Sequence, residues 1–155
     1  MPTYTNRTSL LNEEVGGVLY PIDEVFSEGT PSVIARACCT VGRDLMARPP
    51  LSGEDILRWD VTEAPEIGGW MVGLRINNTG HSIGMNVDQV TASEAIVRVA
   101  EAAQDLLLDE RVEWPNEDGT FLVASGMKDV KGAFWTDRRT GRAVAEVGHL
   151  APTPD

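Results

Sequence analysis

The chain has 155 residues, enough for one domain with a buried core, and its 42% hydrophobic and 24% charged residues are typical of a globular protein. Its 24 acidic and 13 basic residues give a net charge of −11, which argues against nucleic acid and anionic membranes as direct partners, since both carry negative charge. No stretch approaches the roughly 20 apolar residues that span a bilayer, and the first residues lack the pattern of a secretory signal, so we expect a cytoplasmic protein.

The first segment, residues 1–29, combines Thr, Asn, Gly and Pro with short apolar pieces. We expect an extended arm that either packs on the domain or reaches to a partner. The apolar residues that would dock this arm are Leu10, Leu11, Val18, Leu19 and Tyr20. Residues 30–150 are expected to form one α+β domain, and residues 151–155 a flexible tail.

Thr30 and Pro31 predict the start of a helix, because Thr is a good N-cap and Pro suits the first helical position. Pro49 and Pro50 end it. Apolar residues recur at helical spacing and form the expected buried stripe: Ile34, Ala37, Cys38, Val41 and Leu45. The charged residues of the segment lie off this stripe: Arg36, Arg43 and Asp44.

Alternating apolar residues predict three strands over 56–61, 70–76 and 82–87. The turn between the last two lies in residues 77–80. If Asn78 and Thr79 form its tip, the apolar faces of the two strands coincide. The facing pairs would then be Leu74 with Ile83, Val72 with Met85, and Trp70 with Val87.

A second helix is predicted by the capping box of Thr91 and Glu94, and it ends before Trp114. Its expected buried stripe is Ile96, Val99, Ala100, Ala103, Leu106 and Leu107.

Three further strands are predicted over 120–124, 133–137 and 142–147. Pairing Asp137 with Arg142 places Trp135 opposite Val144. The element order therefore predicts an α+β fold: an antiparallel sheet, made of a three-strand meander plus a C-terminal hairpin, with the two helices on one face.

Residues with reactive side chains are few. The two cysteines, Cys38 and Cys39, are adjacent, and the two histidines, His81 and His149, lie far apart, so no zinc-site spacing is present. We expect no metal, cofactor or catalytic residue. The hairpin tip carries Arg138, Arg139 and Arg142, which could bind a carboxylate or phosphate of a partner or be a solvated strand end.

The composition favours a non-enzymatic protein–protein interaction or assembly module, with a protein partner or self-association through the arm. Four Trp residues add to this, because Trp is enriched among interface anchors. An acidic inhibitor that mimics nucleic acid is one alternative. The other is a small-ligand-binding protein or enzyme with a pocket between sheet and helix, in which the groups to test are Arg138, Arg139, His81 and Cys38.

The C-terminal half also resembles a group of small uncharacterised proteins of actinobacteria and their phages, through Trp114-Pro115, Phe134-Trp135 and the run over 140–150. In that group Cys and His residues after the Trp-Pro pair and in a Trp-x-Cys-Pro strand look like half of a zinc ribbon. Here residues 116–118 and 136–137 hold no Cys, so the resemblance implies the hairpin without the metal.

The resemblance points to a phage-encoded protein but carries no known activity. Combined with the interaction hypothesis, it leads us to expect a structural or accessory protein, located in the cytoplasm or in a phage particle. The element order is similar to that of small acidic chaperones of bacterial secretion systems, a likeness of fold that does not fix function.

Overall fold

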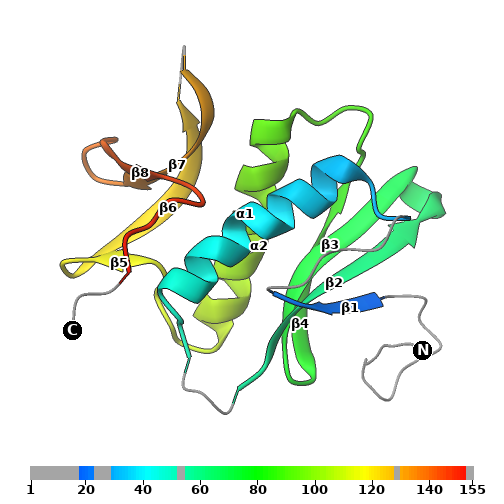
Figure 1. The fold of residues 1–155 in the computed structure, drawn as a ribbon, viewed down its shortest axis with the longest axis horizontal. Helices are drawn as coiled ribbons and strands as arrows, with labels where there is room; N and C mark the ends of the chain where they lie inside the picture. The colour runs from blue at the N-terminus through cyan, green and yellow to red at the C-terminus, as the bar shows by residue number, and fades with distance from the viewer. Residues whose placement is uncertain (1–17, 23–28, 52–54, 128–129, 153–155) are drawn as a thin grey trace.

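The computed structural model describes residues 18–22, 29–51, 55–127 and 130–152. Two helices, α1 (Ser32–Ala47) and α2 (Ala92–Asp109), lie between two antiparallel sheets (Figure 1). The first sheet has the order β1 (Val18–Pro21), β2 (Leu57–Ala64), β3 (Gly69–Ile76) and β4 (Thr79–Met85). The second has the order β5 (Asn116–Glu117), β6 (Thr120–Met127), β7 (Val130–Asp137) and β8 (Ala143–Glu146). A 3-10 helix, η2 (Pro65–Ile67), joins β2 to β3.

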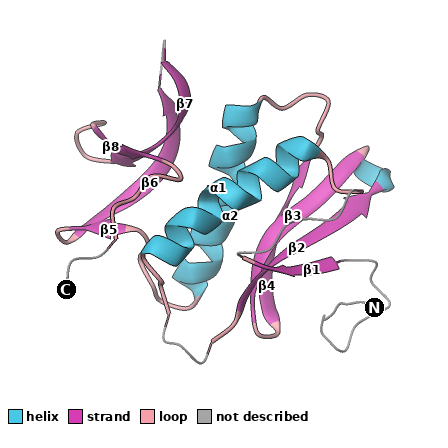
Figure 2. Cartoon of the chain, in the orientation of Figure 1, coloured by secondary structure: helices cyan, strands magenta, loops and turns pink. Residues whose placement is uncertain are grey.

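The α+β class with antiparallel strands is confirmed, but the expectation of helices on one face of one sheet is wrong. The meander and the C-terminal hairpin belong to separate sheets, and α2 packs against β3 and β4 on one side and against β6 and β7 on the other (Figure 2). α1 packs against α2, which is the helix that contacts strands of both sheets.

Part of the predicted N-terminal arm is a strand of the first sheet. β1 pairs antiparallel with β2, so that Val18 lies opposite Val61 and Pro21 opposite Arg58. The backbone of the expected docking residues Val18, Leu19 and Tyr20 therefore packs on the domain. Leu10 and Leu11 lie outside the described residues.

α1 begins one residue later than the sequence predicts. Pro31 occupies the N-cap position, and its carbonyl accepts bonds from the N–H groups of Ile34 and Ala35. The predicted apolar stripe is confirmed as buried: Ile34, Ala37, Cys38, Val41 and Leu45. Asp44 is also buried, although it lies off that stripe, because the C-terminal segment covers it.

The β3–β4 hairpin keeps its predicted apolar face in a different register. Leu74 pairs with His81, Val72 with Ile83 and Trp70 with Met85. The two-residue loop is Asn77-Asn78, and Asn77 adopts φ 52°, a left-handed conformation that Asn tolerates. A shift of two residues leaves every side chain on its original face, which is why the alternation alone could not fix the register.

The C-terminal hairpin contains an irregularity that the sequence did not reveal. Thr136 pairs with Ala143, as expected, but the register then shifts and Trp135 pairs with Ala145 instead of Val144. The Asp137 N–H donates to the Arg142 carbonyl at the end of the hairpin. The chain after the hairpin also contacts the domain, since the Ala151 carbonyl accepts a hydrogen bond from Arg48 Nε at 2.7 Å.

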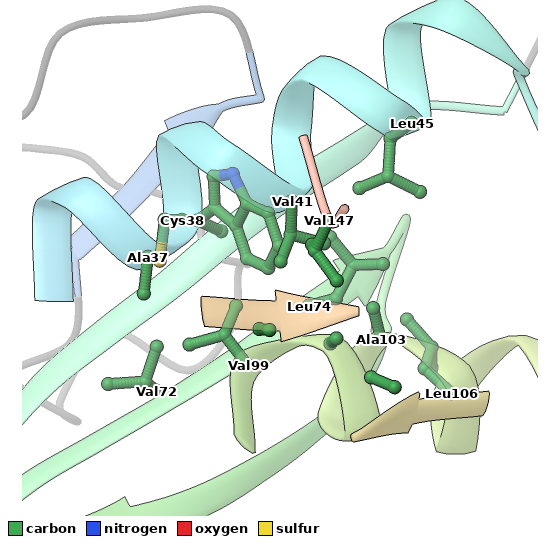
Figure 3. Close-up of a cluster of buried hydrophobic side chains, with 14 of the residues drawn as sticks. Ala37, Cys38, Val41, Leu45, Val72, Leu74, Val99, Ala103, Leu106 and Val147 are labelled. Carbon is green, nitrogen blue, oxygen red and sulfur yellow. The ribbon is translucent and has the colours of Figure 1, made fainter. Parts of the chain in front are cut away.

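One hydrophobic core joins the two helices to both sheets. The capping box of Thr91 and Glu94 is confirmed at the start of α2. Of its predicted stripe only Ile96 is half-buried, and the other residues are fully buried. In Figure 3 side chains of α1, β3 and α2 meet in this core together with Val147 from the C-terminal segment. The two sheets are thus held in a fixed relation by the helices between them.

Candidate functional site

The arginine tip predicted as an anion site is an exposed hairpin end. Arg138, Arg139 and Arg142 are all exposed, and Arg139 Nε lies 3.9 Å from Asp137 Oδ1. Among the described residues no second element adds a polar group to the tip. An exposed pair of this kind contributes little free energy to folding, and the anion-binding role of the tip stays a prediction.

The other reactive side chains lie on separate elements. Cys38 is fully buried, and burial, with a smaller contribution from Cys39, raises the pKa of its thiol, which keeps the sulfur protonated and unreactive. His81 lies in β4 with its Nε2 atom 3.0 Å from Asp109 Oδ2, and His149 is exposed after β8. No interaction joins Cys38, His81 and the arginine tip within the described residues.

In the part of the chain that the structure describes, no group of three or more His, Cys, Asp or Glu side chains could hold a metal ion. None of the described helices is both long enough and apolar enough to cross a membrane.

Asp44 is a buried polar residue that the sequence reasoning missed. Its Oδ2 atom accepts bonds from Trp135 Nε1 at 2.7 Å and from the Gly148 N–H at 2.6 Å, and Oδ1 accepts from the Leu150 N–H at 2.9 Å. These bonds fasten the C-terminal segment to α1. The donors are 91 to 106 residues away in sequence, so no local signal could have identified the contact.

Among the described residues, the seven-residue β4 is the longest strand at the end of a sheet, and its outer edge pairs with no other strand. The Gly84 carbonyl accepts a bond from Arg98 Nη1 at 3.1 Å, so it points away from β3. Because inward and outward backbone groups alternate along an edge strand, Gly80 and Ser82 also direct their N–H and C=O groups outward. These three residues define the β4 edge. Among the described residues only Arg98 bonds to it.

The other three sheet edges carry features that limit strand addition. β1 has four residues and ends in Pro21, and β8 has four residues and pairs through a register shift. β5 covers only the first two residues of β6, and just beyond them both backbone groups of Leu122 are already bonded, to Pro115 and to Gln104. β4 has seven residues in continuous register, with the sequence TGHSIGM, which contains no Pro and no Lys. Natural proteins usually protect a regular edge of this kind, since it is a template for pairing with another chain.

A row of charged residues on α2 borders the β4 edge. Glu94, Arg98, Glu101, Asp105 and Asp109 recur every three or four residues on the exposed side of the helix, and they define the α2 stripe. Two contacts connect the stripe to β4: Arg98 donates a hydrogen bond to the Gly84 carbonyl, and the Asp109 carboxylate contacts the His81 side chain. Glu101 and Asp105 lie between these contacts, and neither carboxylate has a partner among the described residues.

A groove of about 490 Å³ continues from the end of the β4 edge. It is lined by the loop after β4, by the first half of α2 and by Gly126 of β6. Its polar lining residues are Asn86, Gln89, Ser93, Glu94, Arg98 and Glu101, which offer hydrogen bonds and charge. The groove lies between helix and sheet, as the ligand-binding alternative expects, but it contains none of the four residues named for that site.

Sequence reasoning placed the strand and helix that carry these features without recognising the edge. The signal available was the small, uncharged pattern Gly80, Ser82, Gly84 beside the acidic repeat on the following helix. No family model matches the chain, and no curated protein or solved structure matches it either. The geometry of the β4 edge is therefore the main indication of function.

Proposed function

We propose that this protein is a non-enzymatic protein-binding module that captures an extended segment of a partner protein along the β4 edge. The observation that carries the proposal is a contrast among the described residues, between β4, which is long, regular and unprotected, and three edges that are short, irregular or partly bonded. Strand addition to such an edge is a recurrent mode of peptide recognition.

The backbone supplies the affinity in this mode. Gly80, Ser82 and Gly84 each offer one outward N–H and one outward C=O, and within the described residues only the Gly84 carbonyl is engaged, by Arg98. The two glycines and the serine add little bulk next to the edge, so a partner backbone can approach closely. The groove beyond Gly84 would receive a side chain from the end of the bound segment.

The substitution Ser82→Pro tests this function. Proline removes the outward N–H and places its ring on the open side, while the pairing of β4 with β3 uses the neighbouring residues. The probe is a fluorescent peptide of about nine residues that alternates Val or Thr with Lys, a length that spans the edge strand. We expect Ser82→Pro to weaken binding by tenfold or more in fluorescence anisotropy, on the order of the loss of one or two buried hydrogen bonds.

Ser82→Thr is the matched control, since it keeps the N–H and favours a strand. It should bind like the unmodified protein. Far-UV circular dichroism and urea unfolding verify that both variants are folded. The proposal is wrong if the peptide fails to bind the unmodified protein, or if a folded Ser82→Pro variant binds as tightly as Ser82→Thr.

A further inference from the structure

The surroundings of the β4 edge specify the kind of segment that fits it. Resting on the proposed function, we infer that the captured segment is basic, with Lys or Arg at alternate positions. The inference comes from the α2 stripe, which lies beside the place that a bound strand would occupy.

Two contacts fix this position. Arg98 reaches the Gly84 carbonyl at one end of β4, and Asp109 contacts His81 towards the other end, so the stripe follows the strand. Glu101 and Asp105, between the two contacts, are exposed. Alternate side chains of an added strand point to the face of the sheet on which α2 packs, and so towards these carboxylates.

The carboxylates are available for pairing. Glu94 already accepts a bond from the Thr91 N–H, and Asp109 contacts His81, but Glu101 and Asp105 have no partner among the described residues. The stripe thus holds four carboxylates and one guanidinium. Together with the net charge of −11, this gives an electrostatic surface that attracts a positively charged segment.

The same charges disfavour a second copy of this chain as the occupant. Two β4 strands paired antiparallel about a two-fold axis would place both α2 helices on the same face of the joined sheet. The exposed stripes would then face each other, which brings Glu101 and Asp105 of one copy towards those of its partner. Such like-charge contacts oppose self-association and favour a partner of opposite charge.

Three peptides of identical length and Val/Thr pattern test the inference, one with Lys, one with Gln and one with Glu at the alternate positions. We expect the Lys peptide to bind roughly tenfold more tightly than the Gln peptide, since two or three exposed ion pairs form. The Glu peptide should bind more weakly still. Raising the salt concentration from about 0.01 M to about 0.15 M should reduce the difference, because the Debye length falls from roughly 30 Å to 8 Å.

Asp105→Lys is the informative variant, and Glu146→Lys on β8 is its control with the same change in net charge. Asp105→Lys should weaken binding of the Lys peptide roughly threefold to tenfold and strengthen binding of the Glu peptide. Glu146→Lys should change the affinity for both peptides slightly and equally. Equal effects of the two variants would overturn the inference, because net charge alone would then explain the preference.

The outcomes separate this inference from the proposed function. If the three peptides bind equally and Ser82→Pro abolishes their binding, strand capture stands and the charge preference is wrong. If none binds, or if binding ignores Ser82→Pro, strand capture itself is wrong. A dimer in light scattering that Ser82→Pro converts to a monomer would identify a second copy as the occupant and overturn the basic-segment inference.

Discussion

The two helices meet their neighbours in opposite ways. At α1, the Asp44 carboxylate is buried and accepts three bonds from Trp135, Gly148 and Leu150. At α2, the carboxylates of Glu101 and Asp105 are exposed and have no partner among the described residues, and the adjacent β4 edge bonds only to Arg98. The same kind of side chain is thus buried and fully bonded in one region, and exposed without a bonding partner among the described residues in the other.

This contrast separates stability from recognition. A buried carboxylate with three N–H donors must keep them, because each donor would otherwise lose its bond without gaining one to water. An exposed carboxylate contributes little to folding, but it can act on a molecule that approaches. Substitutions in the first region should therefore change the free energy of unfolding, and those in the second should change binding.

The largest expected effect is that of Asp44→Ala. Removing the carboxylate leaves three buried N–H groups unsatisfied, so we expect the free energy of unfolding to fall by about 3–5 kcal/mol in urea titrations. Asp44→Asn retains one carbonyl acceptor, so its free energy of unfolding should lie between those of Asp44→Ala and the unmodified protein. Asp105→Asn is the matched control and should change the free energy by less than about 0.5 kcal/mol.

Equal losses of unfolding free energy in Asp44→Ala and Asp105→Asn would contradict the contrast between the buried and the exposed carboxylates. A loss in Asp44→Ala that came with unchanged protection of the Gly148 and Leu150 amides would also contradict the role assigned to this carboxylate.

A smaller effect on stability is expected where α1 lies close to the backbone that follows β1. A Cβ atom on Gly42 would lie 2.8 Å from the backbone carbonyl oxygen of Ile22, which follows β1. Gly42→Val should force these backbones apart and lower the free energy of unfolding by about 1–3 kcal/mol. Thermal and urea unfolding would show it. A stabilised Gly42→Val variant would mean that this approach is not constrained and that helix propensity dominates.

Much of the secondary structure could be predicted from local pattern. The helical stripe of α1 and the capping box at Thr91 are local features, and both are confirmed. The register of the β3–β4 hairpin was wrong by two residues because such a shift preserves the faces. The division into two sheets depended on how α2 packs on both sides, which no single segment encodes.

The candidate site was less predictable than the fold. Whether a strand lies at an edge depends on which strands pair, so the exposure of Ser82 could not be read from its neighbours in sequence. The burial of Asp44 likewise depends on donors from the end of the chain. The arginine tip, in contrast, was a local pattern, and within the described part of the chain no second element adds a polar group to it.

The most direct test of strand capture is amide hydrogen exchange with and without the Lys peptide. Strand addition should slow exchange at the outward N–H groups of Gly80, Ser82 and Gly84, while His81, Ile83 and Met85, which pair with β3, should change little. Saturating peptide that leaves the three outward amides as fast as in the free protein would contradict the account, because binding would then occur elsewhere.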